Sequence, residues 1–223
     1  MKNYQWISEH VAARKRKEDM PAILVPVKEV QALAQLSDAE VFSTMTRRVF
    51  RAGLKHSLVD AKWPAFEKAF WGFEPFKVAL MSDEQLENLM QNTDIIRHWG
   101  KIKATRLNAF MVDQLAQREG SFATYIANWP SQDIVGLWAQ LKKEGSHLGG
   151  NSGAAFLRML GKDTFMLTDD VVTALKAQGI VDKRPTSKRD LNTVQDAFNT
   201  WHTQSGGVPY AHISRMLACT IGY

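Results

Sequence analysis

The chain has 223 residues, of which 45% are hydrophobic, and this is enough to bury the core of one large domain or two small lobes. Its formal net charge of +5 is compatible with a polyanionic partner. The single cysteine excludes an internal disulfide bond and any metal site built from several cysteines. No apolar run of about 18 residues is present and the N-terminus lacks the apolar segment of a secretory signal, so we expect no membrane span and a cytoplasmic location.

Helical periodicity extends through most of the sequence, whereas the alternation of apolar and polar residues typical of strands is scarce. Ser37 and Glu40 form a capping box that predicts the start of a helix, and Pro64 suits the first turn of the next one. Ser82 and Gln85 form a second capping box. Roughly nine or ten helices with short connections are expected, so the predicted fold class is all-α.

The second half of the chain continues this helical pattern. Gly100 precedes a long helix. Ser131 is placed to cap a helix over residues 132–144, which Gly145 ends. A short helix is expected over residues 153–160.

A glycine-rich turn joins the helices expected at 132–144 and 153–160. At such a turn, glycine permits positive φ angles and lets a ligand approach the backbone closely. Free N–H groups at the start of the second helix suit a phosphate, and Lys142 and Lys143 precede the turn and are placed to assist. Glycine turns between helices often serve only as connectors, so both interpretations stay open at this point.

Two carboxylates, those of Asp169 and Asp170, stand at the start of a further helix, where the helix dipole stabilises a negative charge. One interpretation is that both aspartates cap this helix. The other is that Thr168 or Asp169 caps it, while Asp170 faces a cleft beside the glycine-rich turn.

The order of glycine-rich turn, short helix and Asp-Asp pair resembles the helix-hairpin-helix DNA glycosylases. Three further blocks resemble 3-methyladenine DNA glycosylase I in particular, and the second is the most specific of them: RAGLKHSLVDAKWPAFEKAF (51–70), IIRHWGKI (95–102) and YAHISRMLACTIG (210–222). The resemblance runs from about Asp38 to the C-terminus.

The resemblance implies an all-α fold of two lobes with a cleft between them. Residues 1–40 and 165–223 would form a terminal lobe, and residues 41–164 a central lobe that ends in the helix-hairpin-helix. The two lobes would form one functional unit. No cofactor would be required, although a monovalent cation often accompanies the hairpin. The hairpin backbone would hold a DNA phosphate through Leu148, Gly149, Gly150, Asn151, Ser152 and Gly153.

The implied activity is monofunctional hydrolysis of the N-glycosidic bond of an alkylated purine, such as 3-methyladenine, in base excision repair. Such enzymes flip the base out of the duplex, and a carboxylate stabilises the oxocarbenium character that develops on the deoxyribose. Asp170 falls on the position of the superfamily's catalytic aspartate, and Ser152 on that of the lysine used by strand-cleaving members. We therefore expect a monomer, associated with the nucleoid, whose partner is double-stranded DNA with a damaged base.

The sequence departs from the 3-methyladenine group at several positions. Arg48 stands where a glutamate is usual, and His56 where an aromatic residue is usual. Gln5 stands beside Trp6 where a zinc-binding cysteine would be expected, and Cys219 stands alone, so we expect no zinc. An alternative function is therefore that of a catalytically altered or inactive helix-hairpin-helix DNA-binding protein. A third reading is an all-helical protein without a DNA role.

Four residues are candidates for the base pocket, each with a plainer alternative. Arg48 is a pocket donor, a phosphate contact or an ordinary surface arginine. His56 contributes either to base recognition or to packing. Trp6 and Trp99 either stack on the flipped base or belong to the core.

Basic residues elsewhere are weaker signals. The runs at residues 14–17 and 181–190 either touch the DNA backbone or are solvated faces. Lys101 and Lys103 lie at a helix start, where the dipole disfavours cations by about 0.3–1 kcal/mol, and phosphates nearby would favour them there.

Overall fold

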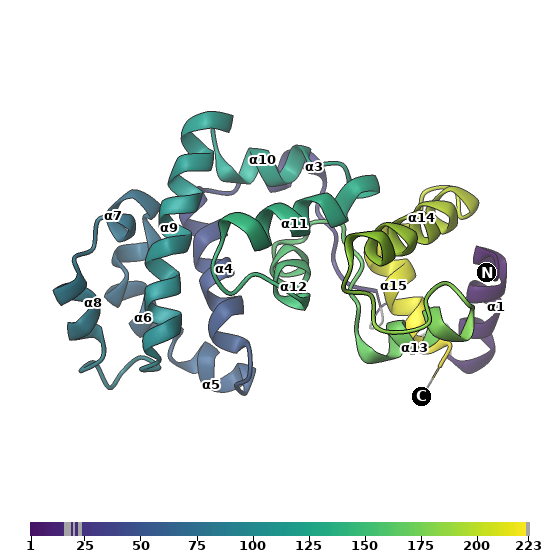
Figure 1. Cartoon of the computed structure of the whole chain (residues 1–223), viewed down its shortest axis with the longest axis horizontal. Helices are drawn as coiled ribbons and strands as arrows, with labels where there is room; N and C mark the ends of the chain where they lie inside the picture. Colours follow the sequence, from purple (N-terminus) through teal and green to yellow (C-terminus); the bar gives the residue numbers. More distant parts are fainter. Residues whose placement is uncertain (16–18, 20, 22–23, 222–223) are drawn as a thin grey trace. The chain divides into compact units, whose positions relative to one another are not determined.

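A computed structural model describes residues 1–15, 19, 21 and 24–221 (Figure 1). No residue in these ranges lies in a β-strand, so the all-α prediction is confirmed. No helix in the described part of the chain combines the length and the apolar character needed to cross a membrane. The helices, in chain order, are α1 (Tyr4–Arg14), α3 (Val30–Ala34), α4 (Asp38–Arg51), α5 (His56–Ala61), α6 (Trp63–Ala69), η2 (Trp71–Phe73), α7 (Pro75–Ala79), α8 (Asp83–Leu89), α9 (Trp99–Glu119), α10 (Phe122–Asn128), η3 (Ser131–Asp133), α11 (Ile134–Glu144), α12 (Asn151–Leu160), α13 (Asp169–Ala177), α14 (Lys188–Gln204) and α15 (Tyr210–Cys219).

Local capping signals begin several of these helices as the sequence predicts. Ser37 accepts a hydrogen bond from the backbone N–H of Glu40, and the Glu40 side chain accepts one from the Ser37 backbone. The same reciprocal pair joins Ser82 and Gln85 at the start of α8, and Pro64 lies in the first turn of α6. Both capping boxes are therefore confirmed.

Three predicted boundaries are wrong. Helix α9 begins at Trp99, so Gly100 lies inside it, and α12 begins at Asn151 rather than at Gly153. Ser131 caps no α-helix, because it starts the short 3₁₀ helix η3 and its hydroxyl donates to the carbonyl of Asp163 at 2.9 Å. A tertiary hydrogen bond has thus replaced the predicted local one.

The chain divides into two compact units. The terminal unit comprises residues 1–28, 130–137 and 161–223, and the central unit comprises residues 29–129 and 138–160. Helix α11 therefore begins in one unit and ends in the other.

The bounds of the units differ from those of the expected lobes, and tertiary hydrogen bonds explain the difference. The carboxylate of Asp38, at the start of α4, accepts the N–H groups of Phe122 and Ala123 at 2.8 and 3.1 Å, which holds this segment in the central unit. In the terminal unit, the side chain of Gln195 accepts the N–H of Val135 at 3.2 Å, so the start of α11 is joined to α14.

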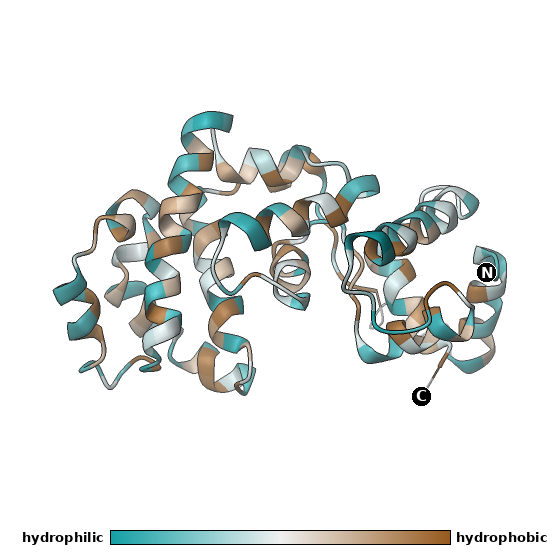
Figure 2. Cartoon of the chain, viewed as in Figure 1, coloured by the Kyte–Doolittle hydropathy of each residue, from teal (hydrophilic) through white to brown (hydrophobic). Residues whose placement is uncertain are grey.

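Aromatic side chains fill the core of the central unit. The rings of Trp63 and Phe73 stack at 5.2 Å between centroids, and Phe50 meets Phe66 edge to face at 4.6 Å. Helix α9 packs against α4, α7 and α10. The helices carry apolar and polar residues side by side along their length, as helices that bury one face should (Figure 2).

The core of the terminal unit lies among α1, α13, α14 and α15. Phe165 stacks on Phe198 at 4.2 Å. The half-buried carboxylate of Asp163 accepts the N–H groups of Tyr210 and Ala211 at 3.1 and 2.8 Å, and so holds the first turn of α15. Burial raises the pKa of Asp163, and burial together with this carboxylate raises the pKa of Tyr210 to about 12. Asp163 is therefore a structural carboxylate.

Candidate functional site

The glycine-rich turn between α11 and α12 is closed by its own backbone. The carbonyl of Leu148 accepts the N–H of Gly153 at 3.2 Å, and that of Gly149 accepts the N–H of Ser152 at 3.1 Å. Gly150 is exposed and has a φ of 57°, which glycine adopts without strain. The N–H groups of Gly149 and Gly150 donate to no described residue. The turn therefore presents unused donors at the start of α12, where an anion is favoured.

A buried asparagine that sequence reasoning missed fixes the entry to this turn. Asn108, on α9, is fully buried, and its side chain donates to the carbonyl of Ser146 at 3.0 Å and accepts the Ser146 N–H at 2.7 Å. A Cβ atom at Gly145 would lie 2.8 Å from the backbone carbonyl oxygen of Leu141, so only glycine fits there. The one available signal was a polar residue on the buried face of the helix, which also carries Lys101 and Thr105.

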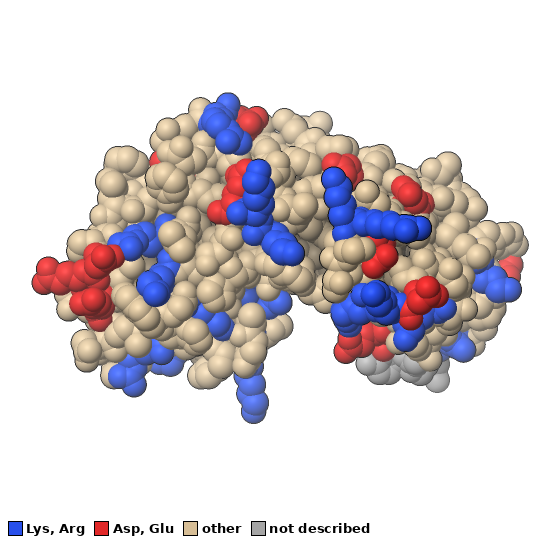
Figure 3. Space-filling view, in the orientation of Figure 1, with Lys and Arg blue, Asp and Glu red and all other residues tan. Residues whose placement is uncertain are grey.

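The two lysines before the turn lie in the last turn of α11, and both are exposed. Lysine and arginine side chains gather over this end of α11 (Figure 3). Among the described residues, neither Lys142 nor Lys143 has a carboxylate partner. Both ammonium groups are therefore unpaired within the described residues, and their contact with a phosphate stays a prediction.

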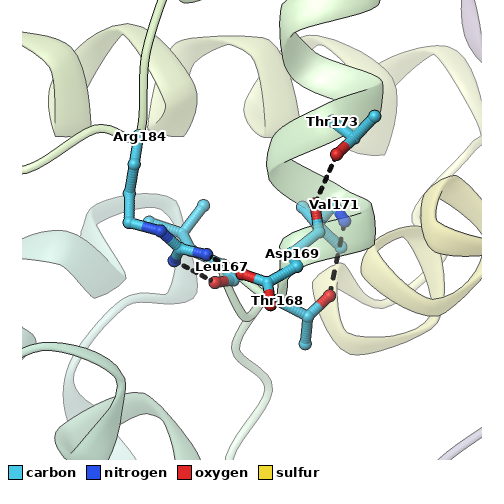
Figure 4. A network of polar contacts seen from close by, with 6 residues as sticks. All are labelled: Leu167, Thr168, Asp169, Val171, Thr173 and Arg184. Carbon is cyan, nitrogen blue, oxygen red and sulfur yellow. Dashed lines mark hydrogen bonds and ion pairs between the residues drawn. The ribbon is translucent and has the colours of Figure 1, made fainter.

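The two aspartates at the start of α13 have different surroundings, and Figure 4 shows the contacts of Asp169. The hydroxyl of Thr168 accepts the N–H of Val171 at 3.3 Å and caps the helix. Asp169 is exposed and forms an ion pair with Arg184, which also donates to the Leu167 carbonyl at 2.9 Å. The interpretation that both aspartates cap the helix is therefore wrong.

Asp170 is the carboxylate left over. It is half-buried in the first turn of α13, and within the described ranges its side chain makes no hydrogen bond and no ion pair. The dipole of α13 favours a negative charge at this end of the helix. The helix thus supplies a charged carboxylate that local structure does not use.

Three arginines near the end of α4 have different surroundings. Arg51 makes a two-pronged ion pair with Asp60, with contacts of 2.5 and 3.1 Å. Arg47 lies over the ring of Trp63, at 4.6 Å from its centroid. Arg48 is half-buried, and its Nε atom, like that of Arg47, is buried without a partner among the described residues. Burial and then the charge of Arg51 lower the pKa of Arg48.

Lys101 does not face a phosphate, which corrects the expectation from its place at a helix start. Its buried ammonium group donates to the carbonyls of Ala52 and Phe50 at 2.6 and 3.1 Å, at the C-terminal end of α4. A cation suits that end of a helix dipole. Burial lowers the pKa of Lys101, and the nearby charge of Arg48 lowers it further.

The remaining base-pocket candidates are placed as follows. His56 is the exposed first residue of α5. Trp99 is half-buried at the start of α9, and the ammonium group of Lys103 lies 5.1 Å from its ring centroid. Trp6 is half-buried, stacks on His10 at 3.7 Å and lines a cavity of about 400 Å³ in the terminal unit. None of the three belongs to a fully buried core, and their roles stay predictions.

The other predicted features lie partly outside the described residues. In the basic run at 14–17, Arg14 donates to the carbonyl of Thr220, and residues 16 and 17 are outside the described ranges. Cys219 is buried and free. Within the described residues, no group of three or more His, Cys, Asp or Glu side chains is arranged to hold a metal ion.

Comparison with known proteins decides the family. The family model of methyladenine glycosylase matches residues 31–187, which include α4, the glycine-rich turn and Asp170. The chain belongs to the methyladenine glycosylase family. Its membership confirms the resemblance to 3-methyladenine DNA glycosylase I, and Trp6 lies outside the matched residues.

Individual relatives of this methyladenine glycosylase family member share a limited part of its sequence. DNA-3-methyladenine glycosylase 1 of Escherichia coli (strain K12) is 38% identical over 76 residues, which are 34% of this chain and 41% of the relative. The match therefore spans less than half the length of that relative. The structure of 3-methyladenine DNA glycosylase I from Staphylococcus aureus is 26% identical, with a TM-score of 0.52 over 61% of this chain and 80% of the other.

A wider likeness concerns the fold alone. The 8-oxoguanine DNA glycosylase of Thermotoga maritima is 16% identical, with a TM-score of 0.53 over 96% of this chain and 94% of the other. The helix-hairpin-helix glycosylase fold is thereby confirmed for nearly the whole chain.

Proposed function

We propose that this chain is a monofunctional DNA glycosylase that hydrolyses the N-glycosidic bond of an alkylated purine in double-stranded DNA. The observation that carries the proposal is the half-buried carboxylate of Asp170, which Thr168 and the ion pair of Asp169 leave unused. Membership of the methyladenine glycosylase family supports it. The expected protein is a monomer that acts in base excision repair at the nucleoid in the cytoplasm.

The glycine-rich turn would hold the DNA. The unused N–H groups of Gly149 and Gly150 suit a phosphate oxygen, and the exposed ammonium group of Lys143 adds an electrostatic attraction that salt weakens. The fixed entry at Gly145 keeps these donors in place without a ligand. A monovalent cation at the turn stays a prediction, and so does the absence of zinc.

Asp170 would act on the deoxyribose of a flipped nucleotide. As the bond from C1′ to the base lengthens, the base leaves with the bonding electron pair and positive charge develops on the sugar. The ionised carboxylate stabilises that charge and orients a water molecule. The water oxygen forms the new bond to C1′, and its proton passes to Asp170. An alkylated purine is already a good leaving group because its alkyl group gives it a positive charge.

Strand cleavage is not expected of this chain. A lyase step needs an amine that forms a Schiff base with the sugar. Ser152 offers a hydroxyl at the superfamily's lysine position, and its N–H is engaged with the Gly149 carbonyl. The product would therefore be an intact strand with an abasic site.

The test is base release from methylated duplex DNA, measured by chromatography of the freed bases. Asp170→Asn should lower the rate by about 10²–10⁴-fold, the usual contribution of a positioned acid or base. The matched control is Asp169→Asn, which changes the neighbouring carboxylate and should stay within a few-fold of the native rate. Thermal melting verifies that both variants are folded. Native activity in the folded Asp170→Asn variant would contradict the proposal.

A second candidate function is a DNA-binding protein without base excision, and the arginine at position 48 favours it. A half-buried guanidinium could fill the place of a base instead of recognising one. This candidate predicts duplex binding that weakens steeply with salt, together with no release of any base. The same chromatography separates the two functions.

A further inference from the structure

The end of α4 holds a cation without a counter-charge. Arg51 has Asp60 as its ion-pair partner, and Arg47 has the face of Trp63. The charges of Asp60 and of Glu67 also act on Arg47. No ion pair or hydrogen bond joins the Arg48 side chain to a described residue, and burial and the charge of Arg51 both lower its pKa.

The surroundings of Arg48 are positive on more than one side. Arg51 lies close enough to affect its charge, and Arg48 in turn affects that of Lys101. Both neighbours are already engaged, Arg51 with a carboxylate and Lys101 with two carbonyls. Neither can supply an acceptor to Arg48.

A guanidinium group has five N–H donors and no acceptor, so it is satisfied only by groups that accept, such as water or a ligand. The Nε of Arg48 is buried, and its other two nitrogens make no hydrogen bond to a described residue. Those two nitrogens form a planar fork that fits a pair of neighbouring acceptors. The buried Nε without an acceptor costs free energy in the protein, and the other two nitrogens stay available to a ligand.

Guanine-type and adenine-type bases differ in the hydrogen-bonding group at position 6. A guanine-type base offers two adjacent acceptors, O6 and N7, whereas an adenine-type base offers N7 beside an N6 amine that donates. The amine would meet the guanidinium donor to donor. A carboxylate at this position would instead accept from the amine and repel O6.

We propose that Arg48 is a specificity-determining residue that selects alkylated purines with a carbonyl at position 6 over those with an amine there. This inference rests on the proposed function, because it concerns which damaged base the chain releases. It names alkylated guanine, and N3-alkylated guanine above all, as the substrate class, since alkylation at N7 would remove one of the two acceptors.

The experiment compares the release of 3-methylguanine and 3-methyladenine from the same methylated duplex DNA. The amount of each base released is divided by the amount of that base in the DNA. Both methylated nucleosides carry a positive charge, so overall charge cancels from the ratio. The native chain should favour 3-methylguanine by about 5- to 150-fold, the discrimination that one two-pronged contact to a base supplies. Arg48→Glu should reverse the preference, and Arg48→Gln, whose amide can pair with the N6 amine and N7 of an adenine-type base, should shift the ratio toward 3-methyladenine.

The matched control is Lys68→Glu, the same kind of charge reversal at an exposed residue of α6. It should leave the ratio as in the native chain. A preference of the native chain for 3-methyladenine overturns the inference. This result comes from the native chain alone, so the inference can be tested even if Arg48→Glu does not fold. An unchanged ratio in folded Arg48→Gln overturns it as well.

Failure of the proposed function would look different. Release of no base at all from the native chain refutes the glycosylase activity, and the inference falls with it. Release of bases without a preference for 3-methylguanine refutes only the role of Arg48.

Discussion

The start of α13 and the end of α4 share one feature. At each place, one charged side chain has an ion-pair partner, and a nearby side chain of the same charge has none among the described residues. At α13, Arg184 forms an ion pair with Asp169 and not with Asp170. At α4, Asp60 forms an ion pair with Arg51 and not with Arg48. The helix dipole favours both free charges, because the anion is at an N-terminus and the cation near a C-terminus.

The two free charges nevertheless differ in their effect on stability. Asp170 makes no ion pair or hydrogen bond in the part of the chain that is described, and it lies in the first turn of a helix, where the dipole favours a negative charge. Arg48 has a buried Nε without a partner and two cationic neighbours. The carboxylate proposed for catalysis, that of Asp170, therefore lowers the stability of the fold little. The arginine proposed for base recognition, Arg48, lowers that stability.

The largest effect on stability should come from the paired arginine. Arg51→Met removes the two-pronged contact and leaves Asp60 without its partner, so the free energy of unfolding should fall by about 1–2 kcal/mol. Denaturant titration measures this change. Lys68→Met, at an exposed residue, is the control and should change the value by less than about 0.5 kcal/mol. An unaltered stability of Arg51→Met would remove one side of the comparison.

A smaller effect of opposite sign is expected at the free arginine. Arg48→Met keeps the apolar stem and removes the unsatisfied charge, so the free energy of unfolding should rise by about 1 kcal/mol. Differential scanning calorimetry should show a melting temperature higher by about 2–4 °C. A lower melting temperature would mean that Arg48 stabilises the free protein and is not held ready for a ligand.

The smallest effect is expected at the free aspartate. Asp170→Asn loses only the favourable interaction with the helix dipole, so the free energy of unfolding should change by about 0.5 kcal/mol or less. The same titration checks this value. A large loss of stability would reveal a structural role for Asp170 and weaken the catalytic one.

Sequence reasoning succeeded where the deciding contact is local. The capping boxes at Ser37 and Ser82 and the turn at Gly149 and Gly150 depend on residues within a few positions of one another. Such contacts follow from residue type and spacing alone. The all-α class and the glycine-rich turn could therefore be predicted.

It failed where a residue distant in sequence competes for the same group. Ser131 donates to Asp163 instead of capping a helix, and Lys101 serves the end of α4 instead of a phosphate. Arg184 lies 15 residues from Asp169 in the sequence and forms an ion pair with it, so the Asp170 carboxylate stays without that partner. Position in the sequence could nominate Asp170 and Arg48, but only tertiary structure shows which charges stay unpaired.

The lone thiol of Cys219 is a natural reporter for one half of the molecule. It is 7% exposed on α15, so a thiol-specific reagent can reach it only when that helix opens. The rate of labelling therefore follows opening of the terminal unit, without an introduced probe. Compared with the melting of the whole chain, it would tell whether substitutions at the end of α4 loosen only their own unit.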